Sequence, residues 1–176
     1  SKKFNSLPIN LKKSKINFFE GKKSIANIKN VKIKYNSKKA EDEIILKGKF
    51  LGDNIYINLN SKNIDSKESI NLILKMASLN FLTKVNFINA EKDKNFRSGN
   101  FLIKKDKNKI TGIFDYKNNK IIIKKSNLTN SFLNGKLEGE IELLPYFSFN
   151  LESNLNTINF TKLYNYFLTL DEKSKK

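Results

Sequence analysis

The chain contains neither histidine nor cysteine, so the usual general bases, nucleophile pairs and zinc ligands are missing. The regularly spaced acidic residues are Glu138, Glu140 and Glu142, and a second acidic group is the run at 41–43. Carboxylates can bind a hard cation, but such a site needs ligands that converge from several directions. We therefore interpret 138–142 as a solvated strand face paired with lysines, and 41–43 as protection of a turn and an edge. No catalytic residue, metal ligand or cofactor is predicted, and we expect a protein that is not an enzyme.

The charge balance is strongly basic, with 34 Lys and Arg against 17 Asp and Glu and a formal net charge of +17. A basic surface can bind nucleic acid by releasing the counterions condensed on phosphates. Arg97, however, is the only arginine, and the abundance of Lys, Asn and Ile is typical of an AT-rich coding sequence. Arginine is the residue that forks onto phosphates and guanine edges, so a nucleic-acid binder is expected to contain more of it. We expect no nucleic acid among the partners and keep a lysine-rich nucleic-acid-binding domain as the least favoured alternative.

These side chains must be positioned by strands, because apolar and polar residues alternate through most of the chain. Strands are predicted around 31–35, 44–50, 55–59, 101–103, 110–116, 121–123, 137–143 and 147–151. The polar segments between them, such as 104–109 and 117–119, are short enough for hairpins. The sequence therefore predicts an antiparallel meander.

Two segments have helical spacing. Residues 66–79 fit either a helix capped by Ser66 or a strand, and the neighbouring strands favour the strand. From Asn159 to Leu168, apolar residues recur at helical spacing, and Asn159 or Thr161 can cap the first turn. We expect one short C-terminal amphipathic helix that covers an apolar edge or face of the sheet.

One phrase occurs twice: LKGKFLG at Leu46–Gly52 returns as LNGKLEG at Leu133–Gly139. Repetition of a β unit builds a long surface rather than a single pocket. The two copies predict a weaker repeat at about 24–89 and a clearer one at about 96–170, within a single domain of residues 1–176. Phe4, Phe18 and Phe19 are interpreted as part of an incomplete repeat whose partner strands lie upstream of residue 1.

The stretch from Asn127 to Phe167 resembles the repeating element of the AsmA family of Gram-negative envelope proteins. In that family, a strand carrying G-x-x-x-G runs into a proline turn, an apolar strand and a segment of the form N-L-N-x-I-N-x-x-x-L. The residues that carry the match are Gly135, Gly139, Pro145, Leu155, Ile158 and Leu163, with a weaker copy at Gly48 and Gly52.

The resemblance implies a mostly β fold, in which the meander curls like a taco shell into a groove. Its apolar interior would bind phospholipid acyl chains and guide them between the inner and outer membranes. The groove would be lined by Val31, Ile33, Ile55, Ile57, Leu59, Leu137, Ile141, Leu143, Phe147, Phe149 and Leu151. Glycines inside strands commonly mark bends, so Gly48, Gly52, Gly135 and Gly139 are the predicted sheet-bending positions.

Alternation alone also fits a structural or adaptor domain, in which the apolar face lies in the filled core of a β-sandwich. No apolar stretch approaches the roughly 18 residues of a membrane span, and residues 1–13 lack the apolar core of a signal peptide. With the resemblance, this predicts a periplasmic segment of a longer envelope protein. Its inner-membrane anchor and its membrane contacts would lie outside this chain.

Overall fold

The computed structural model describes residues 8–38, 40–64, 67–89, 96–144 and 146–174. It has one antiparallel sheet of 11 strands in sequence order, each paired with the next. The strands are β1 (Ile9–Glu20), β2 (Lys23–Lys38), β3 (Glu41–Phe50), β4 (Asp53–Ile64), β5 (Lys67–Met76), β6 (Phe81–Asn89), β7 (Arg97–Lys105), β8 (Asn108–Lys117), β9 (Lys120–Thr129), β10 (Leu133–Glu142) and β11 (Ser148–Ile158). A short 3-10 turn, η1 (Ala77–Leu79), follows β5, and one helix, α1 (Phe160–Ser174), follows β11. The predicted antiparallel meander with a short C-terminal helix is confirmed.

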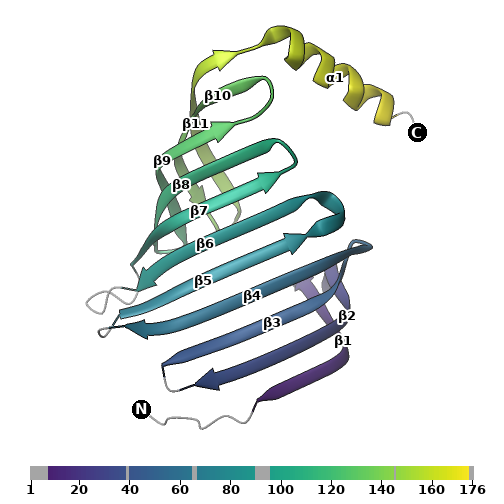
Figure 1. Ribbon diagram of the computed structural model, residues 1–176, viewed down its shortest axis with the longest axis vertical. Coiled ribbons are helices and arrows are strands. Elements are labelled where there is room, and N and C mark those ends of the chain that lie inside the picture. The colour runs from purple at the N-terminus through teal and green to yellow at the C-terminus, as the bar shows by residue number, and fades with distance from the viewer. Residues whose placement is uncertain (1–7, 39, 65–66, 90–95, 145, 175–176) are drawn as a thin grey trace.

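The sheet is a single curled layer. Figure 1 shows the strands side by side along the long axis, with parts of the end strands curling behind the middle strands. Among the described residues, each strand packs mainly against its sheet neighbours, and η1 packs against β4 and β6. Within this part of the chain, no helix or second sheet covers either face.

Tight turns explain why consecutive strands pair. Leu51 and Gly52 form the turn between β3 and β4, with φ of 51° and 90°. Asn118 and Asn119, with φ of 51° and 64°, form the turn between β8 and β9. Two-residue turns with positive φ match the right-handed twist of the strands that they join. Both polar segments that predicted hairpins lie at hairpins, and 66–79 contains strand β5 rather than a helix.

Helix α1 begins where the sequence predicts. The side-chain Oδ1 of Asn159 accepts the backbone N–H of Lys162 at 3.0 Å, which is the expected N-cap bond. The helix does not cover the sheet, however, and Figure 1 shows it projecting beyond β11. The rings of Phe132 and Tyr166 are 5.2 Å apart and join it to the β9–β10 connection. Its apolar side chains stay largely exposed, with Phe160 at 72% and Phe167 at 58%, so the expected covering role is wrong.

The two copies of the glycine phrase lie in different structural contexts. The first copy of the glycine phrase spans the end of β3 and its turn, whereas the second lies inside β10. The two copies therefore occupy different places in the sheet. At the N-terminal end, Phe18 and Phe19 lie on β1, which pairs with β2 along one edge. Phe4, Ser66 and Pro145 lie outside the described residues.

Candidate functional site

One face of the sheet is mainly apolar across its middle strands, from β2 to β9. Because side chains alternate between faces, residues that are direct partners in neighbouring strands share a face. One such row crosses eight consecutive strands, from β2 to β9. It consists of Ile33, Leu46, Ile57, Leu74, Thr83, Ile103, Ile110 and Leu128. We call this side of the sheet the apolar face.

Two further rows run parallel to the first. The second consists of Tyr35, Ile44, Leu59, Leu72, Val85, Phe101, Gly112 and Ser126. The third contains Ile70, Phe87, Gly99, Phe114 and Ile123 on strands β5 to β9. Most of these apolar side chains are only half-buried. A single-layer sheet cannot bury them further without something placed on top.

The apolar face is closed at one end. Val31 is fully buried, and it packs with Ile28, Ile55 and Met76 in a small core that joins strands β2, β4 and β5. Gly48 makes this packing possible, because a Cβ there would lie 2.6 Å from Cγ2 of Ile28. At this end the sheet has curled far enough to pack against itself, as a filled core does.

The predicted groove residues fall into three groups. Val31 and Ile55 are buried in the small core, so they are not available to a ligand. Ile33, Ile57, Leu59, Leu137, Ile141 and Leu151 are half-buried within strands. Leu143, Phe147 and Phe149 are exposed, with Phe147 at 68% and Phe149 at 66%. Leu143 and Phe147 lie outside the strands, in the β10–β11 connection.

Several of these residues are brought together although they are distant in sequence. Leu46 stands between Ile33 and Ile57 in the first row. Ile141 is the direct partner of Phe149, and the ring of Phe149 lies 6.2 Å from that of Phe147. The residues of the two sequence copies nevertheless lie at opposite ends of the sheet, joined by strands β5 to β9.

Three of the four predicted bending glycines lie inside strands. Gly48 lies under the small core, while a Cβ at Gly135 would lie 2.6 Å from the carbonyl oxygen of Asn154. Gly139 has φ of 135°, a conformation that other residues rarely adopt. Gly52 is different, because it lies in the β3–β4 turn and bends no strand.

The other end of the apolar face carries a polar rim. Arg97 begins β7 on this face, opposite Tyr116 of β8 and Asn89 of β6. Its guanidinium carbon lies 5.6 Å from the ring centre of Phe87 and 5.8 Å from that of Tyr116. The amide nitrogen of Asn89 donates to Glu68 at 2.5 Å. Sequence patterns did not predict this rim, and its one signal in the sequence is the single arginine.

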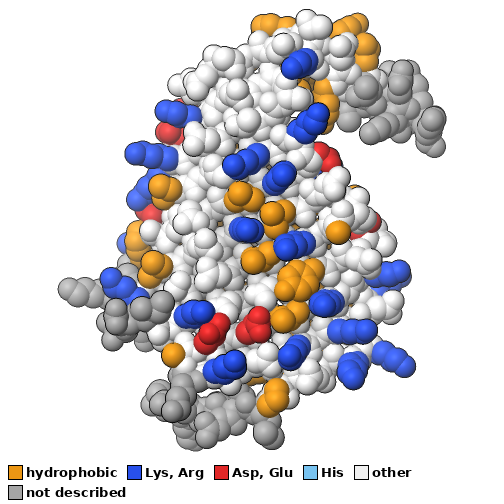
Figure 2. Space-filling view, in the orientation of Figure 1, with side chains coloured by type: hydrophobic (Ala, Val, Ile, Leu, Met, Phe, Trp, Pro, Cys, Tyr) orange, Lys and Arg blue, Asp and Glu red, His pale blue; other side chains and the backbone are white. Residues whose placement is uncertain are grey.

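The opposite side of the sheet, which we call the lysine face, is polar. Figure 2 shows lysine side chains spread over it, with hydrophobic side chains between them. A shallow hollow of about 770 Å³ on this side is lined by Lys84, Leu102, Ile113 and Lys125 among others. Alternating charge and apolar side chains are typical of a solvated sheet face.

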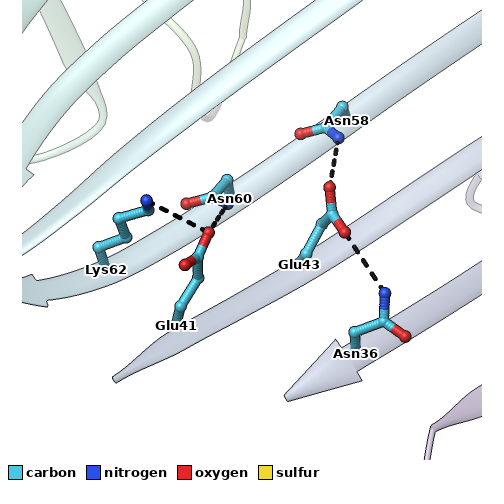
Figure 3. A network of polar contacts seen from close by, with 6 residues as sticks. All are labelled: Asn36, Glu41, Glu43, Asn58, Asn60 and Lys62. Atoms are coloured by element: carbon cyan, nitrogen blue, oxygen red, sulfur yellow. Dashed lines mark hydrogen bonds and ion pairs between the residues drawn. The ribbon is translucent and has the colours of Figure 1, made fainter. Parts of the chain in front are cut away.

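The acidic run at 41–43 lies on this sheet rather than at its edge. Glu41–Phe50 form β3, between β2 and β4, so the predicted edge protection is wrong. Figure 3 shows Glu41 accepting from Asn60 and pairing with Lys62, and Glu43 accepting from Asn58 and Asn36. The hydrogen bond from Asn60, helped by Lys62, lowers the pKa of Glu41. The run therefore ties three strands together.

The other acidic group pairs with lysine as predicted. The Nζ of Lys120 lies 2.6 Å from Glu142 and 3.7 Å from Glu140. The hydrogen bond and charge of Lys120 lower the pKa of Glu142, and Glu142 in turn raises the pKa of Lys120. Among the described residues, no group of acidic side chains is arranged to hold a metal ion.

Comparison of the chain with family models, curated proteins and solved structures gives no match. In the part of the chain that the structure describes, no helix is both long and apolar enough to span a membrane. The candidate site is a long half-buried apolar face, closed at one end by the small core and edged by the polar rim at Arg97.

Proposed function

We propose that this chain is a non-enzymatic lipid-binding segment, whose apolar face binds the acyl chains of phospholipid and guides them along the sheet. The observation that carries the proposal is the register of the apolar rows. Aligned side chains cross consecutive strands from β2 to β9. In the first row, Ile33, Leu46, Ile57 and Leu74 pack against the small core, and within the described residues no helix or second sheet lies over the rest of the rows. Large uncovered apolar surfaces on proteins commonly mark binding sites.

The length of the face suits a lipid tail. Neighbouring strands lie about 4.8 Å apart, so a row across eight strands extends over roughly 34 Å. The hydrocarbon core of a bilayer is about 30 Å thick, so the tails of one leaflet span about 15 Å. An acyl chain lying across the strands is therefore shorter than the row and has room to move along it.

The chemistry of the face favours retention without a fixed position. Each buried methylene group of a bound chain contributes about 0.8 kcal/mol. Because successive strands offer similar aliphatic side chains, a chain displaced by one strand exchanges one set of contacts for an equivalent one. Such a surface holds a lipid and still lets it slide.

The place of action follows from the resemblance of residues 127–167 to the AsmA repeat. On that basis we propose that the chain works in the periplasm, as a segment of an envelope protein that passes phospholipid between the inner and outer membranes. The membrane anchor and the membrane contacts would be supplied by parts of the protein outside this chain.

The test compares two neighbouring residues of β5. Leu72 and Ile73 are both half-buried, but Leu72 lies on the apolar face and Ile73 on the lysine face. We expect Leu72→Asn to lower the bound phospholipid severalfold, because it places an amide in the middle of the apolar rows. Ile73→Asn should retain lipid like the unchanged protein. The measurement is lipid extraction and mass spectrometry on protein purified without detergent from a bacterial envelope fraction.

A second candidate function, a structural β domain with a filled core, is favoured by the small core around Val31. In that case, a further layer would cover the apolar face and the protein would carry no lipid. Folded protein that is free of lipid would support this alternative. Equal lipid content in the Leu72→Asn and Ile73→Asn variants would show that the apolar face is not where lipid binds.

A further inference from the structure

Arg97 stands out because of where its charge lies. By register, the lysines of strands β3 to β6 lie on the lysine face, and these are Lys47, Lys49, Lys62, Lys67, Lys75 and Lys84. Arg97 lies on the opposite, apolar face, at one end of its strand, and Lys105 lies on the same face at the other end. A cation at the rim of an apolar surface is placed to meet an anion whose apolar part lies on that surface.

The surroundings of Arg97 hold its guanidinium group in position. Half-buried Arg97 lies between the rings of Phe87 and Tyr116, which attract a cation through their π faces. Its Nε is buried and has no hydrogen-bond partner among the described residues. Asn89, its direct partner on β6, has a buried Oδ1 that also lacks a partner there. Unsatisfied buried polar atoms are rare and require an explanation, such as a ligand.

The residue type is informative as well. This chain uses lysine at its other basic positions, so general solubility does not require an arginine here. Arginine differs from lysine in stacking on aromatic rings while its planar fork stays free to bind phosphate with two parallel hydrogen bonds. At this position, stacking on two rings would hold the guanidinium group at the edge of the apolar face and leave its N–H groups free for a phosphate.

We propose that Arg97 binds the phosphate of a phospholipid whose acyl chains lie on the apolar face, a proposal that rests on the function proposed above. From Arg97, the same face of β7 continues with Gly99, Phe101 and Ile103. Gly99 has no side chain, so no side chain at this position fills the space on the sheet beside the guanidinium group. The headgroup thus lies at the rim, and the tails pass the rings of Phe101 and Phe114, whose centres are 6.3 Å apart, to reach the rows that cross the strands.

The test compares phosphatidylglycerol with a diacylglycerol that has the same acyl chains and no phosphate. Lipid-stripped protein is incubated with each lipid, and the bound lipid is quantified by mass spectrometry. We expect the unchanged protein to bind phosphatidylglycerol at least about tenfold more tightly, since charge-assisted hydrogen bonds are the stronger class. Arg97→Met should remove this preference and leave diacylglycerol binding unchanged. The matched control is Lys104→Met, on the same strand but on the lysine face.

Each outcome decides between the two proposals. If the unchanged protein binds neither lipid, both are overturned. If Arg97→Met is folded by circular dichroism and keeps the preference, the phosphate site is overturned while the lipid-binding face stands. If soluble glycerol phosphate binds as tightly as phosphatidylglycerol, the site takes free phosphate and the headgroup assignment is overturned. Should Arg97→Met fail to fold, Arg97→Lys is used, and full retention of the preference in that variant overturns the proposal.

Discussion

At the scale of single residues, glycine decides where this sheet can curve. A Cβ at Gly48 would lie 2.6 Å from Cγ2 of Ile28, a side-chain methyl group, and 3.1 Å from the backbone oxygen of Lys29. A Cβ at Gly99 would instead collide with the backbone of β6, at the carbonyl oxygen of Asn86 and at Cα of Phe87. A side chain can rotate away from an added methyl group, whereas a paired strand can move only by breaking its ladder. Gly99 is therefore the stricter requirement.

We expect Gly99→Ala to lower the free energy of unfolding by about 2–3 kcal/mol, within the range of overpacked interiors. Gly48→Ala should cost less, about 1 kcal/mol, because the closest contact of its Cβ is a side-chain methyl group rather than the backbone. Urea denaturation followed by circular dichroism measures both variants against the unchanged protein. Equal losses in the two would show that backbone approach at Gly99 does not limit the packing of β6 against β7.

At the scale of elements, the two edges of the sheet differ. Strand β1 carries Lys12, Lys13 and Lys15, and its pairing with β2 is interrupted by several register shifts. Lysines and irregular pairing are common means of preventing unwanted strand addition. Strand β11 contains neither lysine nor proline, and its one register shift lies near the end of its ladder. The β11 edge is thus the one suited to pairing with a further strand.

Among the described residues, the contacts between helix α1 and the rest of the chain include the Phe132–Tyr166 ring pair and the backbone bond from Asn159 to Phe132. We therefore expect removal of residues 160–176 to change the free energy of unfolding of the sheet by less than about 0.5 kcal/mol, as for a surface change. The measurement is urea unfolding followed at a β-sheet wavelength, with Phe132→Ala in the full chain as the matched control. A loss of several kcal/mol would mean that the helix packs on the sheet in solution.

At the scale of the whole molecule, the sheet is long, open and apolar on one side. The small core around Val31 closes one end, and the rim at Arg97 borders the apolar rows along β6 to β8. The half-buried rows run across the strands and are longer than one lipid tail. The fold is therefore suited to holding tails along a path rather than in a single enclosed pocket.

The length of the apolar rows predicts how many phospholipids one chain binds. A row of roughly 34 Å is about twice the span of roughly 15 Å that one leaflet's tails cover, so we expect up to two phospholipids per chain at saturation. Native mass spectrometry with increasing phosphatidylglycerol measures the number directly. The Leu72→Asn variant serves as the control and should bind fewer. Strict binding of one lipid at all concentrations would point to a single pocket instead of a path.

Much of this architecture is predictable from local patterns in the chain. Alternation at 31–35, 44–50 and 110–116 predicts strands and the face of each side chain, and polar turns such as Asn118-Asn119 predict hairpins. The phrase shared by Leu46–Gly52 and Leu133–Gly139 is less reliable, because similar letters fall on a turn in one copy and on a strand interior in the other. A short motif does not specify the register of the strand that contains it.

By itself, the sequence determined most of the strands, their antiparallel order, the two faces and the single arginine, because pleat and turn geometry act over a few residues. Strands β1 and β6 were not predicted from it. Only the tertiary structure decided that Val31 and Ile55 are buried while Phe149 is exposed, and that α1 leaves the apolar face uncovered. It also brought Arg97 between Phe87 and Tyr116, which come from two other strands. These features depend on the register and curvature of the whole sheet, which local sequence patterns do not specify.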